Sequence, residues 1–300
     1  MNILVTGFKG QLGSELHRNL IGQATELGAL PEALKGASVN RVDLPEADIS
    51  NLEQMRGIVE QNKPNVIINC AAYTNVDGCE ADPDTALKVN ALGARNMAVL
   101  ANECGAKLIH ISTDYVFPGD GRRPYQEWDM CGPNNVYGYS KLLGEQYVRE
   151  FCDRYFIVRT AWLYGYEGGN FVKTILRIAK DSGELNVVDD QHGNPTNAAD
   201  LAHHLLKLAA IEQYGIYHCT NNGECSWYEF AREIIRLAGF DCIVNPCTSA
   251  EFPRPAMRPA YSGMDNTMLR ATVGDEMRSW QDAIAAYMSH YNKITGGIEW

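Results

Sequence analysis

The sequence predicts a doubly wound α/β fold, in which helices cover both faces of a parallel sheet. Short apolar runs alternate with helix-like segments over the first half of the chain. The chain also opens with an apolar run that leads directly into a glycine-rich turn and a leucine-patterned helix. With 300 residues, 45% of them hydrophobic, the chain can bury a sizeable core. Such alternation is typical of parallel sheets, whose ligands bind at the carboxyl ends of the strands.

The elements of this sheet can be assigned in order. The predicted strands span residues 2–7, 38–42, 66–69, 108–112 and 156–159. The first predicted helix begins at residue 12, and three further helices are predicted over residues 51–61, 82–104 and 136–151. After residue 165, glycine and proline interrupt shorter elements. We therefore expect a dinucleotide-binding domain over residues 1–164 and a smaller substrate-binding lobe over residues 165–300, interleaved with the first.

Three glycines follow the first strand at intervals of three residues. Gly7 allows a tight turn, Gly10 lets the backbone approach a pyrophosphate, and Gly13 lets helix and strand pack closely. Gln11 and Leu12 belong to the same turn. The N-terminus of the helix offers free N–H groups and the positive end of its dipole to phosphates. This turn predicts a nicotinamide dinucleotide site, against the simpler interpretation of a plain strand-to-helix connection.

The end of the second strand bears on the choice between NADH and NADPH. Asp43 stands there, and a carboxylate at this point suits a ribose with two free hydroxyls. Leu44 follows, where an arginine would favour a 2′-phosphate. Because Arg41 lies close by, we expect only a mild preference for NADH, and NADPH stays open.

A tyrosine and a lysine four residues apart form the strongest catalytic signal. Tyr137 and Lys141 share one face of a predicted helix. An ammonium beside a phenol favours the phenolate, so we expect Lys141 to lower the pKa of Tyr137 and make it a proton donor and acceptor. Thr113 ends the fourth strand, where it can hydrogen-bond a substrate oxygen and Tyr137; its neighbour Ser112 is an alternative.

Composition narrows the class of partner and compartment. The net charge of −11 argues against nucleic acid as a partner. The longest apolar runs are too short to cross a membrane, and the first residues lack a signal-like pattern. The nine cysteines occur singly, as expected for reduced thiols in the cytoplasm. The histidines show no metal-ligand spacing, so we expect no metal site from this pattern.

The glycine turn, the hydroxyl-bearing strand end and the Tyr137–Lys141 pair together resemble the extended short-chain dehydrogenase/reductase superfamily, with its Rossmann-like fold. Within it, nearly the whole chain resembles the family of dTDP-4-dehydrorhamnose reductases. The more specific shared motifs lie at residues 70–77, 112–117, 135–145, 159–165, 169–171 and 254–259. The last of these, Pro-Ala-x-Arg-Pro, separates this family from most sugar-nucleotide epimerases.

The resemblance implies an activity and a set of site residues. NAD(P)H would reduce the 4-keto group of a dTDP-linked 4-keto-6-deoxy sugar, giving dTDP-L-rhamnose for cell-surface polysaccharide. Tyr137 would protonate the alkoxide, Lys141 would hold the nicotinamide ribose, and Asn90 would support the lysine through a water. Further cofactor contacts would come from Asp48, Ile49, Cys70, Ala71, Ala72 and Tyr73. Substrate contacts would come from Thr113, Asp114, Trp162, Asn170 and Arg258.

The resemblance also bears on assembly, because Glu15 matches a position that joins a magnesium site at a dimer interface in some members. Mg²⁺ and a homodimer are therefore expectations of lower weight.

Three alternatives stay open. An epimerase or a dehydratase acting on a nucleotide sugar shares this fold, although a dehydratase usually needs an acidic pair where only Asp114 stands. The regulatory subunit of methionine adenosyltransferase shares much of the pattern and acts as a binding partner. A sensor that binds NAD(P)H without turnover is the third. The presence of Tyr137, Lys141 and Thr113 favours catalysis.

Overall fold

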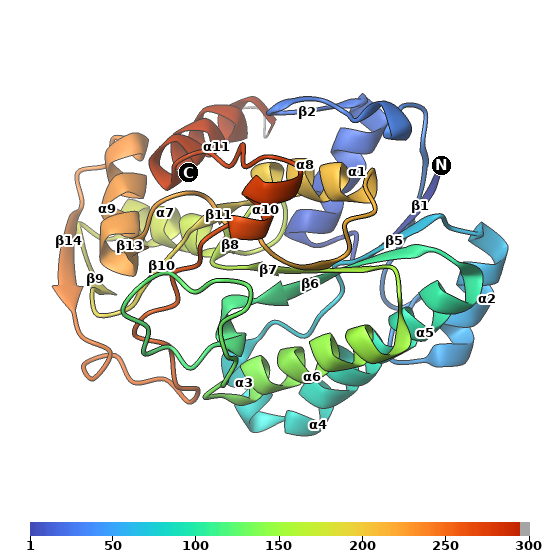
Figure 1. The fold of residues 1–300 in the computed structure, drawn as a ribbon. Coiled ribbons are helices and arrows are strands. Elements are labelled where there is room, and N and C mark those ends of the chain that lie inside the picture. The colour runs from blue at the N-terminus through green and yellow to red at the C-terminus, as the bar shows by residue number, and fades with distance from the viewer. Residues whose placement is uncertain (295–300) are drawn as a thin grey trace.

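A six-stranded parallel sheet forms the centre of the molecule (Figure 1). The structure, a computed structural model, describes residues 1–294. The sheet contains, in spatial order, β12 (Gly215–His218), β7 (Tyr155–Thr160), β6 (Lys107–Thr113), β5 (Val66–Asn69), β1 (Asn2–Thr6) and β4 (Ser38–Val42). The predicted doubly wound α/β fold is confirmed. Five of the strands were predicted from their apolar runs, whereas β12, which comes from the second half of the chain, was not.

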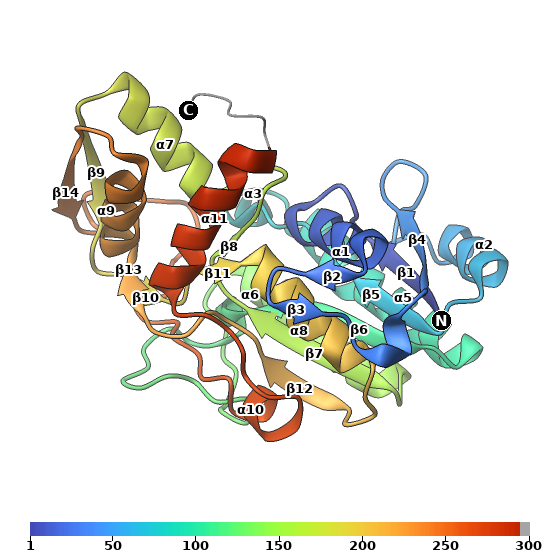
Figure 2. The same cartoon turned by 90° about the horizontal axis from the view of Figure 1, so that it is seen from above.

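Helices cover both faces of this sheet, as Figures 1 and 2 show. One face is covered by α1 (Gln11–Gly22) and α8 (Ala198–Ala209), and the other by α2 (Leu52–Asn62), α5 (Ala94–Cys104) and α6 (Val136–Phe151). The leucines at every fourth position of α1 lie on its buried face, so the pattern that predicted this helix also explains its packing.

The long helix predicted over residues 82–104 is confirmed as a continuous helical stretch over residues 83–104. It consists of α4 (Pro83–Ala86), a π-helical segment η2 (Leu87–Gly93) and α5. The π-helical middle was not predicted. Here α6 packs so closely that a Cβ on Gly144 would lie 2.4 Å from the Asn90 carbonyl oxygen. Hydrophobic periodicity does not report such a tertiary contact. Inserted π-turns are frequent at functional sites.

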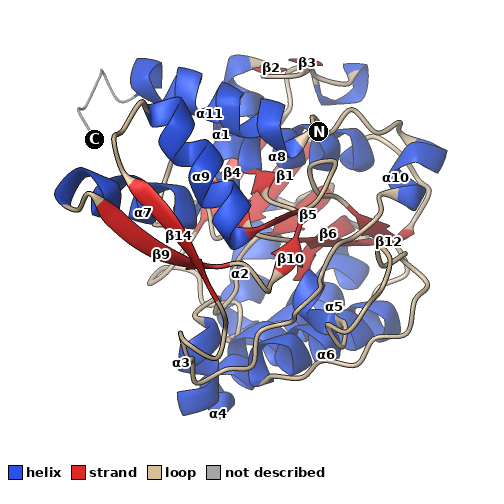
Figure 3. Cartoon of the chain, turned by 90° about the vertical axis from the view of Figure 1, so that its left-hand side faces the viewer, coloured by secondary structure: helices blue, strands red, loops and turns tan. Residues whose placement is uncertain are grey.

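The second lobe lies beside the carboxyl ends of the strands and has its own aromatic core (Figure 3). Helices α7 (Phe171–Asp181) and α9 (Trp227–Ala238) pack against a parallel pair of strands, β9 (Glu184–Val188) and β14 (Ile243–Cys247), and α11 (Trp280–Ile294) packs against α9. The chain leaves this lobe between β9 and α9 to supply α8 and β12 to the sheet. Residues 165–294 thus contribute to both parts of the molecule.

Short elements complete the fold. They are β2 (Ala24–Thr25), β3 (Gly28–Ala29), η1 (Glu32–Leu34), α3 (Val76–Ala81), η3 (Asp114–Val116), β8 (Leu163–Tyr164), β10 (His192–Gly193), β11 (Thr196–Asn197), β13 (Cys225–Ser226) and α10 (Thr267–Thr272). None of the helices within residues 1–294 combines the length and apolar composition that a bilayer crossing requires.

Candidate active site

The glycine turn between β1 and α1 is built by backbone packing. Gly7 has a φ of +65°, a conformation that favours glycine. A Cβ on Gly7 would lie 2.8 Å from the Ala71 backbone nitrogen, and a Cβ on Gly13 would lie 2.4 Å from the Gly7 carbonyl oxygen. Both contacts are shorter than real Cβ atoms make. The turn therefore requires glycine at both positions, and Gly10 completes it by donating its N–H to the Gly7 carbonyl at 3.1 Å.

The first turn of α1 suits a pyrophosphate. Its N-cap residue is Gly10, which supplies no side-chain cap, and the turn contains no acidic residue. The first N–H groups of a helix have no partner within the helix, and the helix dipole attracts anions to them. The residues present therefore fit the phosphates of a dinucleotide.

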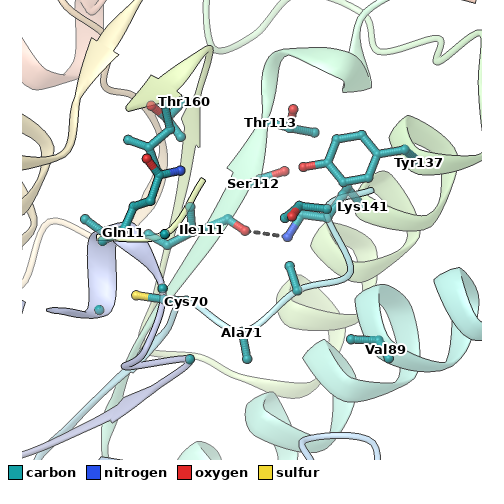
Figure 4. A pocket seen from close by; sticks show the side chains of 18 of the residues that line it. Gln11, Cys70, Ala71, Val89, Ile111, Ser112, Thr113, Tyr137, Lys141 and Thr160 are labelled. Carbon is teal, nitrogen blue, oxygen red and sulfur yellow. Dashed lines mark hydrogen bonds between the residues drawn. The ribbon is translucent and has the colours of Figure 1, made fainter. Parts of the chain in front are cut away.

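A cavity of about 730 Å³ extends from this turn across the carboxyl ends of the strands. It brings together most of the residues predicted for the cofactor: Gly7, Gly10, Gln11, Leu12, Gly13, Asp43, Asp48, Ile49, Cys70, Ala71, Ala72, Tyr137 and Lys141. Thr113, Asp114 and Trp162, predicted for the substrate, line the same cavity. Figure 4 shows Tyr137, Lys141, Ser112 and Thr113 on one side of it, with Gln11 and Thr160 on the other.

The acidic residues predicted for the adenosine end are held by backbone groups. The Asp43 carboxylate accepts hydrogen bonds from the backbone N–H groups of Lys9 and Leu44, both at 2.8 Å. This ties the end of β4 to the glycine turn. The Asp48 carboxylate accepts from the backbone and hydroxyl of Ser50, while Ile49 is buried.

Tyr137, Lys141 and Thr113 line one side of the cavity and come from two neighbouring elements. Tyr137 and Lys141 stand in the first two turns of α6, whose N-cap Asn135 accepts from the Gly138 N–H at 2.8 Å. The Lys141 ammonium donates to the Ile111 carbonyl of β6 at 2.6 Å (Figure 4). Thr113, at the end of the same strand, lies close to Tyr137, and its hydroxyl donates to the Asp114 carboxylate at 3.0 Å. Helix α6 therefore presents the predicted acid and its lysine to the strand end.

The expected lowering of the Tyr137 pKa was wrong. Burial raises the pKa of Tyr137 well above its ordinary value, and the neighbouring Thr113 hydroxyl acts in the opposite direction. Lys141 is not among the groups that shift this pKa, and its ammonium donates to the Ile111 carbonyl. Burial also lowers the pKa of Lys141 to about 8, although Glu145 and Cys70 act to raise it. Tyr137 is thus a neutral phenol at physiological pH, which is the form that donates a proton.

Asn90 lies behind the cavity and fixes one of its walls. Its side-chain oxygen accepts from the Tyr73 N–H at 2.8 Å, and its amide donates to the Tyr73 carbonyl and the Ser140 hydroxyl, both at 3.0 Å. It therefore clamps the segment after β5 onto α6. Neither Asn90 nor Tyr73 lines the cavity, so the structure gives both a supporting position.

Of the predicted substrate residues, Asp114, Thr113 and Trp162 line the cavity, whereas Asn170 and Arg258 do not. Asp114 is buried, which raises the pKa of its carboxyl to about 6, although the hydrogen bond that Thr113 donates to it at 3.0 Å opposes the shift. The Asn170 side chain caps α7 and donates to Gln11, and Arg258 forms an ion pair with Asp77 at 3.0 Å.

Sequence reasoning missed an aromatic wall contributed by the second lobe. Trp227, the first residue of α9, stacks on Trp162 with ring centroids 3.6 Å apart, and both rings line the cavity. Trp162 has a φ of +47°, which is uncommon for a bulky residue. Ser226, which precedes Trp227, forms a capping box with Glu229. The Ser-x-x-Glu pattern is typical of a helix start, but nothing in the sequence indicated that Trp227 would line this cavity.

Glu15 lies away from the cavity among charged side chains. Burial raises the pKa of its carboxyl to about 7, while Arg18, at 2.8 Å, opposes the shift. Within residues 1–294, no group of three or more His, Cys, Asp and Glu side chains is arranged to hold a metal ion. The magnesium expectation for Glu15 stays a prediction.

Comparison with known proteins agrees with this geometry. The family described as RmlD substrate binding domain matches residues 1–293. A dTDP-4-dehydrorhamnose reductase from Streptomyces griseus is 42% identical over 94% of this chain and 91% of its own length.

Solved structures agree as well. One of a dTDP-4-dehydrorhamnose reductase from Clostridium acetobutylicum has a TM-score of 0.91 at 46% identity, covering 97% of this chain and 99% of the other. Another, from Bacillus anthracis in complex with NADP, has a TM-score of 0.90 at 42% identity, covering 96% and 99%. The chain therefore belongs to the dTDP-4-dehydrorhamnose reductase family of the extended short-chain dehydrogenases/reductases.

Proposed function

We propose that this protein reduces the 4-keto group of dTDP-4-dehydro-6-deoxy-L-mannose, also called dTDP-4-dehydrorhamnose, to give dTDP-L-rhamnose, with NAD(P)H as the hydride donor. The observation that carries the proposal is one cavity that joins an anion-binding glycine turn to a neutral, half-buried Tyr137 with Thr113 and Lys141 beside it. A hydride donor and a proton donor acting on the same carbonyl are what ketone reduction needs.

The chain's own residues have distinct tasks in this reaction. The bound nicotinamide supplies the hydride. Tyr137 donates its phenolic proton to the oxygen that becomes the 4-hydroxyl, and Thr113, which lies close to that phenol, would hydrogen-bond the same oxygen or tune the tyrosine. Lys141 would hold the nicotinamide ribose with its ammonium group. Burial favours this arrangement, because electrostatic interactions are stronger away from water.

Positions farther from the reacting carbonyl are assigned by their place in the cavity. Asp114 and Trp162 contact the sugar, and Trp227 supports Trp162 from the second lobe. We propose Arg258 and Asn170 as substrate contacts, although each must first leave its present partner, Asp77 for Arg258 and Gln11 for Asn170. Arg258 would leave Asp77 for the diphosphate, since arginine forms charge-assisted hydrogen bonds to phosphates.

The function can be tested by supplying the 4-keto sugar nucleotide, made in place from dTDP-glucose by the preceding enzymes, and following loss of reduced cofactor. The native protein should consume it, and Tyr137→Phe should not, while binding NAD(P)H as before. Equal consumption by both proteins would refute the role of Tyr137. Cofactor binding without reduction of any nucleotide sugar would favour the regulatory-subunit alternative.

We propose a mild preference for NADH, supported by Asp43 beside the glycine turn. The Lys9 ammonium, from the same turn, donates to the Leu44 carbonyl at 2.7 Å, and both residues line the cavity. It supplies a positive charge that a 2′-phosphate can use, so NADPH should also bind. Titration with each cofactor tests this choice. Asp43→Asn should weaken NADH more than NADPH, and Lys9→Ala should weaken only NADPH.

We further propose that the protein works as a homodimer in the cytoplasm. All nine cysteines are unpaired, which fits a reducing compartment. Sedimentation of the purified chain tests the dimer, and a repeat with Mg²⁺ tests whether the metal strengthens it through Glu15. The Glu15→Gln variant is the matched control for that effect.

A further inference from the structure

A buried carboxylate connects the catalytic helix to the strand that carries Thr113. Glu145 lies one turn after Lys141 on α6 and is 2% exposed. Its Oε1 accepts from the Ser112 hydroxyl at 2.5 Å, while the Lys141 ammonium donates to the neighbouring Ile111 carbonyl at 2.6 Å. Two consecutive residues of β6 are thus each held by one charged side chain of α6.

The same carboxylate forms a buried ion pair with the next strand. The guanidinium of Arg159 donates to the Glu145 carboxylate at 2.8 and 3.0 Å, and Arg159 is 2% exposed. On β7, Arg159 lies in register with Ser112. A buried ion pair is weak evidence for stability, because two well-packed apolar residues often serve as well. Stability of the fold alone therefore does not explain why this pair lies beside Lys141.

We propose that Glu145 is a positioning residue for the reduction, which keeps the Lys141 ammonium charged and fixes the end of β6 that presents Thr113. The inference rests on the proposed function, because it acts through Lys141 and Thr113. Glu145 itself does not line the cavity that contains Tyr137. Together with Arg159, it lines a separate cavity. It therefore acts through its neighbours.

The charges around Lys141 support this role. Burial lowers the pKa of Lys141 to about 8, and Glu145 is the larger of two groups that oppose the shift, the other being Cys70. His110 of β6 also faces Lys141, but burial lowers the pKa of its imidazole well below the ordinary value, so it is neutral. Arg159 and Cys131 face Glu145. Removing the charge of Glu145 should therefore lower the pKa of Lys141 further.

The test uses two variants with opposite electrostatic consequences. Glu145→Gln removes the negative charge and keeps an acceptor for Ser112, whereas Arg159→Gln removes the positive charge and leaves Glu145 in place. For each protein, NADPH affinity and kcat are measured from pH 6 to pH 10. Glu145→Gln should move the alkaline limb of both profiles down by about one pH unit, the low end of the effect of a nearby opposite charge. Arg159→Gln should not move it down.

Two further variants keep the test decisive. Glu145→Gln combined with Arg159→Gln leaves no unpaired buried charge and should show the same downward shift if the single variant folds poorly. Glu150→Gln, an exposed change on the same helix, should match the wild type. The inference would be overturned if both single variants lost NADPH affinity and kcat equally while the alkaline limb of their pH profiles stayed in place. It would also be overturned if the NADPH affinity of the wild type did not fall at alkaline pH. The affinity profile needs no sugar, so a shifted limb without sugar reduction would refute the proposed function alone.

Discussion

Gly13→Ala tests how tightly the cofactor turn is built. The added Cβ would lie 2.4 Å from the Gly7 carbonyl oxygen and 2.5 Å from the Phe8 Cα, so the backbone must move by about 1 Å to restore ordinary contact. Overpacking of this kind costs about 1–3 kcal/mol of unfolding free energy. The movement also displaces N–H groups at the start of α1. Loss of one charge-assisted hydrogen bond, about 1.5–3 kcal/mol, should weaken NAD(P)H binding by at least about tenfold.

Gly22→Ala, in the same helix, is the matched control. Its Cβ would meet nothing within 4 Å, so the change should leave cofactor affinity unaltered and raise the unfolding free energy by about 0.4–1 kcal/mol. Urea unfolding and fluorescence titration with NADPH measure both quantities. If Gly13→Ala bound the cofactor as tightly as Gly22→Ala does, the close-packed turn would not be what forms the pyrophosphate site.

Three further outcomes follow from the site. Tyr137→Phe should lower kcat by about 10²–10⁴-fold in cofactor-oxidation assays, and a parallel loss of NAD(P)H affinity would instead indicate a structural defect. Asn90→Ala should lower the unfolding free energy in urea by about 3 kcal/mol, because buried partners on Tyr73 and Ser140 are left unsatisfied; a loss under 1 kcal/mol would contradict the clamp. The folded-state pKa of Asp114 is raised from 3.8 to about 6. Protonation of Asp114 therefore stabilises the folded state by about 3 kcal/mol below about pH 4, and this contribution is lost as pH rises through 6. Asp114→Asn should flatten that part of the pH dependence, measured by urea unfolding at each pH.

Local signals predicted the sheet strands well. The strands β1 and β5 are buried on both faces, so each contains a continuous apolar run, and β6 contains apolar residues on either side of His110. Strand β12 is short and partly exposed. It joins the sheet because the chain returns from the second lobe to the sheet after β9. The π-helical turn at Asn90 depends on a close approach to Gly144. Both features arise from tertiary packing that local periodicity does not encode.

The parts of the candidate site that were predicted best are those whose residues lie close together in the sequence. The glycine turn and the Tyr137–Lys141 pair each lie within a few residues of sequence and meet in the cavity. The expected lowering of the Tyr137 pKa was wrong because helix spacing indicates which side chains share a face, whereas burial dominates the pKa of this phenol. Trp227 was missed because it enters the cavity from a distant helix of the second lobe.

The most direct test of hydride delivery to carbon 4, with Tyr137 as proton donor, is isotopic. Reduced cofactor carrying deuterium on the transferred position of the nicotinamide is supplied with the 4-keto sugar nucleotide, and the product is examined by proton NMR. The account predicts dTDP-L-rhamnose with deuterium at carbon 4, formed by the native protein and reduced by about 10²-fold or more in Tyr137→Phe. Product without deuterium at that carbon, or equal labelling rates in both proteins, would contradict it.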